Sequence, residues 1–270
     1  MKNVIRWGLI VLCLAVFCFA GYKLAATLLE YKAAEDFYAN AAGAYVVPET
    51  EPAGGAEAPH VQRVTPPEGG PDIFIQEDGQ ETAPITVDFE KLRADNSDVV
   101  GWLYCEDTPI NYPVVQSGDN DYYLHRMLDG SYSSSGTIFL DYQCARDFSY
   151  DNSILYGHNM RNGSMFHSLV EYANQEYYDA HPVLYLLTPE QNYAVKLFAG
   201  FVTDADGWAY VLQFGSEEEK AAYLERALAA SSFDAAVTPE TGDCLLTLST
   251  CSYQYDNARY VVLGVLTPIA

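Results

Sequence analysis

The chain has 270 residues, of which 49% are hydrophobic, so it is long enough for one large domain with appended segments. Its formal net charge of −23 argues against a nucleic-acid partner, because a polyanion would be repelled by such a field. The 22 tyrosines and 12 phenylalanines are typical of a β-rich protein.

The N-terminal segment has the character of a membrane anchor. Residues 1–6 form a basic cytoplasmic leader, and residues 7–29 form an apolar span that only Lys23 interrupts. A span of about 20 apolar residues crosses a bilayer, and the positive-inside rule keeps a basic leader in the cytoplasm. We therefore expect a single-pass signal anchor with the N-terminus inside. A cleaved signal peptide ending near Ala20 is the alternative.

Residues 30–84 are predicted to be an extracellular stalk. Residues 22–46 would extend the anchor helix beyond the membrane, and residues 47–71 are dominated by proline, glycine, glutamate and alanine. A segment of this composition lacks the apolar surface needed to order itself. We expect it to be a flexible, proline-stiffened tether.

The pattern becomes globular over residues 85–270. Short apolar stretches separated by turn residues indicate strands, and residues 215–232 (GSEEEKAAYLERALAASS) carry the clearest helical pattern, with Ser216 as the N-cap. Two further strands, CLLTLSTC and RYVVLGVL, follow and are separated by residues 252–258. We therefore expect a mainly β domain with peripheral helices, built as a closed or nearly closed β-barrel.

Three polar residues stand at strand ends, where a barrel presents catalytic groups. His158 follows a strand and a glycine in ILYGHNM, and Cys251 ends CLLTLSTC between polar neighbours. Arg259 begins the next strand, so antiparallel pairing would return it to the side of Cys251, where a cation stabilises a thiolate and an acyl-transfer oxyanion. Taken singly, a cysteine is more often a small core residue and a strand-end arginine a surface charge.

The motifs ILYGHNM, TLSTC and NARYVVLGVL, in this order, resemble the His, Cys and Arg signatures of sortases. The resemblance runs from NSDVVGWL through INYPVVQ, DNDYYL and GTIFLDY to the end of the chain. DNDYYL and the long helix before the Cys strand are similar to class B sortases. The resemblance implies a closed, eight-stranded sortase-type β-barrel preceded by an N-terminal transmembrane helix.

The resemblance also implies an activity. It is that of a membrane-anchored cysteine transpeptidase, which cleaves an LPxTG- or NPxTN-like sorting signal near the C-terminus of secreted proteins. The cleaved protein is then joined to an amine of the peptidoglycan cross-bridge or precursor. Cys251 would form the thioacyl enzyme, His158 would protonate the leaving amine and deprotonate the incoming one, and Arg259 would hold the oxyanion or the substrate backbone. The same resemblance implies a substrate groove lined by Asn120, Leu124, Tyr156, Ser249 and Tyr210.

Two alternatives fit the same residues: a surface cysteine peptidase that hydrolyses its substrate, and a non-catalytic binding module on the same barrel. No cofactor and no metal are expected, because no cluster of acids stands at metal-ligand spacing. Asp256, the acid nearest to Cys251, is not assigned a catalytic role. A disulfide between Cys105 and Cys144 is left open, and Cys244 is interpreted as a core residue.

Overall fold

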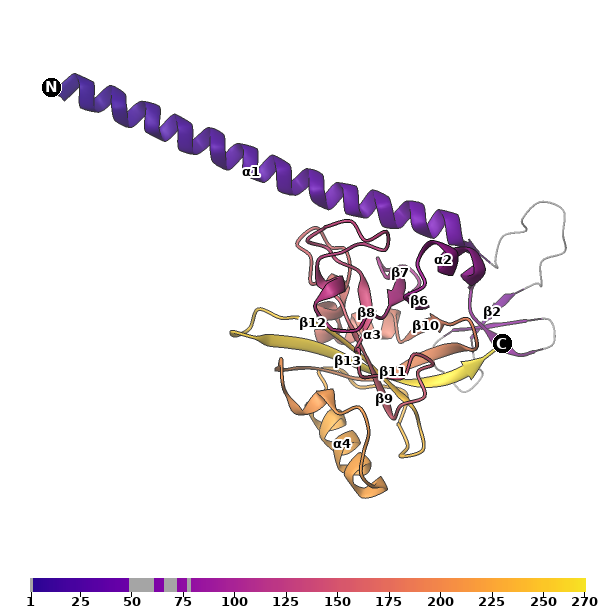
Figure 1. Ribbon diagram of the computed structural model, residues 1–270. Helices are drawn as coiled ribbons and strands as arrows, with labels where there is room; N and C mark the ends of the chain where they lie inside the picture. The colour runs from indigo at the N-terminus through magenta and orange to yellow at the C-terminus, as the bar shows by residue number, and fades with distance from the viewer. Residues whose placement is uncertain (1, 49–60, 66–71, 77–78) are drawn as a thin grey trace.

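The computed structural model describes residues 2–48, 61–65, 72–76 and 79–270. Eight strands of this described part close into a barrel in the order β10-β11-β13-β12-β9-β8-β7-β6, which confirms the expected closed barrel (Figure 1). Neighbouring strands are antiparallel except for β7–β8 and β9–β12, which are parallel. The barrel strands are β6 (Val99–Tyr104), β7 (Asn111–Val115), β8 (Ile138–Leu140), β9 (Asn152–Tyr156), β10 (Val183–Leu187), β11 (Asn192–Asp204), β12 (Leu245–Cys251) and β13 (Ala258–Ile269).

Helices cover the outside of the barrel. Helix α4 (Glu217–Ala230) begins at the expected cap, where the Ser216 hydroxyl accepts a hydrogen bond from the Glu219 N–H at 3.2 Å. Its buried face, including Tyr223 and Ala227, packs on the outer surface of β11. The other helices on the barrel are α2 (Phe89–Asp95), α3 (Gln175–Ala180) and the 3₁₀ helices η1 (Tyr122–Leu124), η2 (His167–Ala173) and η3 (Trp208–Tyr210).

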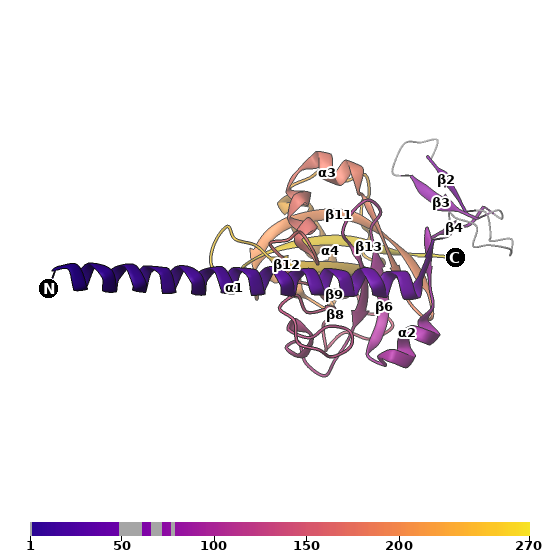
Figure 2. The same ribbon diagram turned by 90° about the horizontal axis from the view of Figure 1, so that it is seen from above.

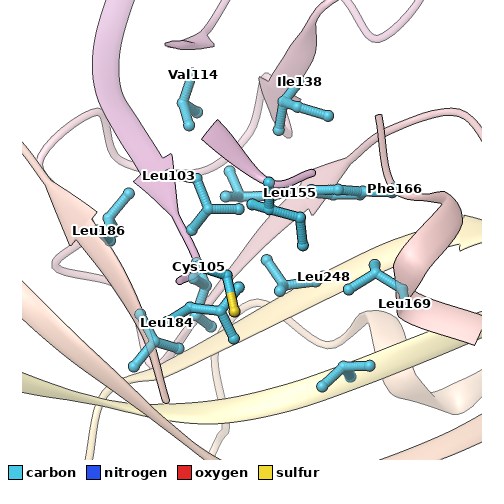
Figure 3. Packing of buried hydrophobic residues seen from close by; sticks show 14 of the residues in the cluster. Leu103, Cys105, Val114, Ile138, Leu155, Phe166, Leu169, Leu184, Leu186 and Leu248 are labelled. Carbon is cyan, nitrogen blue, oxygen red and sulfur yellow. The ribbon is translucent and has the colours of Figure 1, made fainter. Parts of the chain in front are cut away.

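The barrel interior is filled by aliphatic side chains from facing strands. Leu103, Leu155 and Leu248 come from three strands and are fully buried, and Phe166 and Leu169 close the core from the segment after β9 (Figure 3). This packing holds the strand ends, and therefore any groups they carry, in fixed positions.

The cysteines of the barrel are free thiols. Cys105 and Cys144 are buried and unbonded, so the disulfide that the sequence left open is not formed. Burial raises the pKa of Cys105 to about 12 and that of Cys144 to about 11, which keeps both thiols protonated and unreactive. Cys244 is half-buried against the core, as expected.

Helix α1 (Lys2–Tyr45) runs without a break from the apolar segment onto the barrel (Figures 1 and 2). Its N-terminal part is exposed and, by length and composition, apolar enough to cross a membrane. Its C-terminal part buries Ala34, Tyr38 and Ala41 against the barrel. The Tyr38 hydroxyl donates to the Gly136 carbonyl at 2.6 Å and lies 2.9 Å from the Thr137 hydroxyl. The anchor and the barrel are therefore joined by packed side chains as well as by the chain itself.

Within the predicted stalk, residues 30–84, the described residues include short strands. Strand β1 (Val46–Pro48) pairs with β5 (Ile85–Val87), and β2 (Gln62–Val64), β3 (Ile73–Ile75) and β4 (Glu81–Thr82) form a small sheet. Phe74 of this sheet packs edge-on against Tyr185 of the barrel. Composition does not reveal such strands, because each is very short and depends on its pairing: β1 pairs with β5 about 40 residues away, and β2, β3 and β4 pair with one another. Residues 49–60 and 66–71 of the predicted tether lie outside the described residues.

Candidate active site

The predicted nucleophile and the predicted cation face each other on the β12–β13 hairpin. Cys251 is the last residue of β12, and the antiparallel register pairs its Cα with that of Arg259, as the sequence predicts. Residues 252–257 connect the two strands. The Cys251 residue is half-buried, in contrast to the buried thiols of the core.

The parallel pairing of β9 with β12 brings His158 to the same end of the barrel. Ser249 pairs with Tyr156, and the same register continued past the end of β9 sets His158 level with Cys251. Backbone pairing does continue, because the Gly157 N–H donates to the Ser249 carbonyl at 3.1 Å. Two strands that are far apart in the sequence thus present the candidate base and nucleophile side by side.

Glycine is required directly before His158. A Cβ at Gly157 would lie 2.5 Å from Ile138 Cδ1 and 2.6 Å from the Phe166 ring, distances that force these core groups to move. The absence of a side chain lets the end of β9 lie on the core. The glycine of the ILYGHNM motif therefore sets the position of the histidine that follows it.

Asn159 connects the loop after His158 to β12, the strand that ends at Cys251. Its Nδ2 donates to the Cys251 carbonyl at 2.9 Å, and its Oδ1 lies 2.7 Å from His167 Nδ1. An amide oxygen only accepts, so His167 Nδ1 carries the hydrogen in this pair. Neither residue was among those predicted, although Asn159 lies within the motif that drew attention to His158.

The His158 ring is held by Leu124, a predicted groove residue. His158 Nε2 lies 2.7 Å from the Leu124 carbonyl oxygen, and since a carbonyl only accepts, Nε2 carries a hydrogen, so in the neutral ring Nδ1 is the unprotonated nitrogen. Burial lowers the pKa of His158; the bond to Leu124 opposes this effect, and the nearby charge of His125 adds to it. Within the described residues, the ring makes no hydrogen bond to the Cys251 thiol. The resting site therefore holds a neutral imidazole.

Arg259 carries a positive charge that no acid neutralises among the described residues. Its Nη1 donates to the carbonyls of Asn257 at 3.3 Å and Ala258 at 3.1 Å. Asp256 in the same loop is exposed and forms no ion pair with it. The guanidinium is thus anchored by one nitrogen, which leaves its other donors free for an incoming group.

Ser249, Tyr156 and Tyr210 form a continuous wall beside Cys251. The Tyr210 hydroxyl lies 2.8 Å from the Ser249 hydroxyl, and the Tyr156 and Tyr210 rings stack with centroids 6.2 Å apart. Burial raises the pKa of Tyr210, while its bond to Ser249 and the charge of Arg259 oppose the rise. The three residues come from β12, β9 and η3, so the structure brings these predicted groove residues together.

A buried carboxylate, Asp141, joins Asn120 to Tyr156 and was not predicted. Its Oδ2 accepts from Asn120 Nδ2 at 2.9 Å and from the Tyr156 hydroxyl at 3.0 Å, and its Oδ1 accepts from the Gln143 N–H at 2.9 Å. Asp141 is 7% exposed, and no basic side chain of the described residues pairs with it. Burial and the charge of Asp141 raise the pKa of Tyr156. The Tyr156 hydroxyl therefore donates to Asp141 and leaves its oxygen as an acceptor.

The chain is similar in sequence to known proteins. A family model for the sortase domain matches residues 103–267. Sortase B of Listeria monocytogenes is 31% identical over 268 residues, which cover 98% of each chain. Sortase B of Staphylococcus aureus is 28% identical over 184 residues, which cover 67% of this chain and 75% of that protein.

Solved structures of sortase B proteins are also similar to this chain. The Staphylococcus aureus sortase B–substrate complex aligns with a TM-score of 0.65 at 28% identity and covers 67% of this chain and 85% of that chain. Sortase B of Bacillus anthracis in complex with AAEK1 aligns with a TM-score of 0.68 at 29% identity and covers 89% of this chain and 99% of that chain.

Proposed function

Because this chain belongs to the sortase family and is a class B cysteine transpeptidase, we propose that it cleaves a C-terminal sorting signal of secreted proteins and joins them to a cell-wall amine. The observation that carries the proposal is the register that sets Cys251 between Arg259 on one neighbouring strand and His158 at the end of the other. The Staphylococcus aureus relatives have been solved as a substrate complex and with a glycine tripeptide, which supports a peptide and an amine as the two reactants.

The first half of the reaction forms a thioacyl enzyme. His158 Nδ1, the nitrogen that Leu124 leaves free, takes the proton of the Cys251 thiol, and the sulfur attacks the scissile carbonyl. A carbon–sulfur bond forms as the carbon–nitrogen bond breaks, and the proton passes from His158 to the leaving amine. In the second half, an incoming amine gives its proton to His158, its nitrogen forms a bond to the acyl carbon as the carbon–sulfur bond breaks, and His158 returns the proton to the Cys251 sulfur.

Arg259 supplies the positive charge at the oxyanion. The guanidinium is held by its own loop and carries no ion-pairing acid, so its charge is available where negative charge develops on the substrate carbonyl. Since Cys251 and Arg259 are register partners, donor and nucleophile approach the same carbonyl from adjacent strands.

The sorting signal lies in the groove lined by Asn120, Leu124, Tyr156, Ser249 and Tyr210. Leu124 links the groove to the chemistry, because its carbonyl holds the His158 ring. The Tyr156 oxygen offers an acceptor for a peptide N–H, because its own hydrogen is committed to Asp141. A bound peptide thus contacts the residues that orient the base.

A peptide carrying an LPxTG- or NPxTN-like motif tests the proposal with the full-length chain in detergent. Mass spectrometry of the products, with and without oligoglycine and other amines, separates transfer from hydrolysis. We expect an amide between the acyl fragment and the amine, and no reaction with Cys251→Ala. If no amine of the panel enters the product, the enzyme is the alternative, a surface cysteine peptidase.

We propose further that residues 1–6 are cytoplasmic, residues 7–29 span the membrane, residues 30–84 form the stalk, and residues 85–270 act on the cell-wall side. The exposed, apolar N-terminal part of α1 supports this orientation together with the basic leader. A membrane-impermeant methanethiosulfonate added to intact cells should label Cys251. A Cys251 thiol that stays unlabelled on intact cells but reacts after permeabilisation would place the domain inside, and one that never reacts would favour the binding module.

A further inference from the structure

Five exposed tyrosines surround the candidate site. Outside α1, the large hydrophobic side chains that the described residues expose are these tyrosines together with Val47, Val202 and Leu228. Each tyrosine lies in a loop or turn that carries, or directly follows, a candidate site residue. They are Tyr122 in η1, Tyr132 in the segment after η1, Tyr142 after Asp141, and Tyr253 and Tyr255 in the loop after Cys251.

The same end of the barrel lies toward the anchor. In both ribbon views the exposed N-terminal part of α1 extends past the end of the barrel that carries the β12–β13 loop (Figures 1 and 2). Glu30, the first residue after the predicted span, accepts a hydrogen bond from the Ser134 N–H at 2.8 Å. The segment that contains Tyr132 is therefore level with the first helical residue outside the bilayer.

The angle between anchor and barrel is fixed at a second point. Tyr38 is 4% exposed and bonds to Gly136 and Thr137 at the end of the same segment. Glu30 and Tyr38 lie two helical turns apart on α1, so the two contacts hold the barrel against rotation about the helix. The barrel end with Cys251 is thereby presented to the membrane surface.

A minor part of the net negative charge lies at this end. Residues 119–136, 158–167, 204–210 and 252–259, together with Asp141, contain three arginines and seven aspartates, whereas the whole chain has a net charge of −23. Most of the net negative charge therefore lies elsewhere. An anionic bilayer surface repels the other faces more than this one, which favours the same orientation.

We propose that the catalytic end of the barrel rests on the headgroup layer of the bilayer through Tyr132 and Tyr253, so that the Cys251 site opens at the membrane surface. These two side chains are 73% and 76% exposed. A tyrosine ring suits this layer, since its apolar body and polar hydroxyl match the boundary between hydrocarbon and water. The inference rests on the proposed anchoring of residues 7–29.

The docking surface reaches the candidate base through two ring contacts. The Tyr132 and His125 rings lie 6.0 Å apart, and the His125 and His158 rings stack at 5.8 Å. A site in this position opens toward peptides and amines that are themselves held at the bilayer surface. Confinement to one surface raises the effective concentration of such partners for the enzyme.

Fluorescence depth measurement tests the docking. Full-length chains carrying Trp7→Phe, to remove the fluorophore of the span, receive Tyr132→Trp or Tyr253→Trp and are reconstituted in phosphatidylcholine–phosphatidylglycerol vesicles. A fraction of the phosphatidylcholine carries a nitroxide on its headgroup. The matched control is Val47→Trp, which is 48% exposed just beyond the C-terminal end of α1, about 22 Å along the helix from Glu30.

We expect the nitroxide to quench the introduced tryptophan several-fold more at positions 132 and 253 than at position 47. Equal quenching at the three positions overturns the docking. A second outcome would also overturn the docking. In it, the nitroxide does not quench Tyr253→Trp, and this tryptophan is shielded from aqueous acrylamide only at a high protein-to-lipid ratio. That result would assign the surface to contact with a second copy of the chain. The readout does not depend on turnover, so its failure is distinct from failure of the sorting reaction.

Discussion

The His158 Nε2 lies 2.7 Å from the carbonyl oxygen of Leu124, so a residue of the proposed substrate groove holds the proposed base. A carbonyl partner selects one tautomer and leaves Nδ1 as the basic atom. Since Leu124 is part of η1, any displacement of η1 by a peptide in the groove would also displace the base. Binding and proton transfer are linked through this one hydrogen bond.

The pH dependence of cleavage should report the lowered pKa of His158. Burial favours the neutral ring, so the base stays active at pH values below the ordinary histidine pKa of about 6.5, and kcat/KM falls only as pH drops further. His125 contributes to the lowering, so His125→Gln should move the acidic limb of the profile to higher pH. The measurement is kcat/KM for a sorting peptide between pH 4.5 and 8. An acidic limb that moves to lower pH contradicts the assigned role of His125.

The lowered pKa of His158 also makes the stability of the fold depend on pH. His158 is neutral in the folded chain at a pH where an unfolded chain already binds a proton, so its contribution is present above pH about 6.5 and is lost as pH falls through the lower folded pKa. In chemical denaturation, His158→Asn should flatten the fall in unfolding free energy over this window. If the unfolding free energy of His158→Asn falls with pH as steeply as that of the unsubstituted chain, the pH dependence does not come from His158.

Arg259→Lys should lower kcat by about 100-fold or more, because a lysine provides a point charge in place of a planar fork with several donors. Binding of the peptide should change less than kcat if the charge acts on the oxyanion. Arg226→Lys is the matched control, since Arg226 stacks on Trp208 at 4.2 Å on the outer helix α4. Near-normal kcat in Arg259→Lys would show that the planar guanidinium is not required for turnover and that a single positive charge is sufficient.

The Cys251–Arg259 pairing could be predicted from the sequence, because two strands joined by a short loop have few arrangements other than a hairpin. The parallel contact between β9 and β12 could not, since neither strand carries a local signal for a partner about 90 residues away. Only the resemblance to a family placed His158 beside Cys251.

Asp141 and Tyr38 show the other limits of the sequence. An aspartate at a strand end is normally solvated, so nothing marked Asp141 as a buried acceptor for Asn120 and Tyr156. Tyr38 lies in a stretch that was predicted as stalk, and its partner Gly136 is 98 residues away. Both roles arise from tertiary contacts rather than from local pattern.

Asp141→Asn should raise KM for the peptide several-fold with a smaller effect on kcat. An asparagine has one side-chain oxygen where Asp141 has two, so its amide nitrogen faces either the donors of Asn120 and Tyr156 or the Gln143 N–H, and the groove wall loses its orientation. The alkylation rate of Cys251 should stay unchanged, because Asp141 does not contact the thiol. In a double-mutant cycle, Asp141→Asn and Tyr156→Phe should be non-additive. Additive losses would falsify a shared role, and Asp147→Asn on the exposed surface serves as control.

Gly157→Ala should destabilise the barrel by about 1–3 kcal/mol and lower activity together with stability. The added methyl meets Ile138 and the Phe166 ring at 2.5 and 2.6 Å, and relief of this overlap must move either the core or the chain that leads to His158. Gly118→Ala is the control, because nothing lies within 4 Å of its added Cβ. Chemical denaturation measures the loss of unfolding free energy, and the cleavage assay measures the displacement of the base. A variant with full stability and full turnover shows that the end of β9 has room for a side chain, and that the glycine does not set the position of His158.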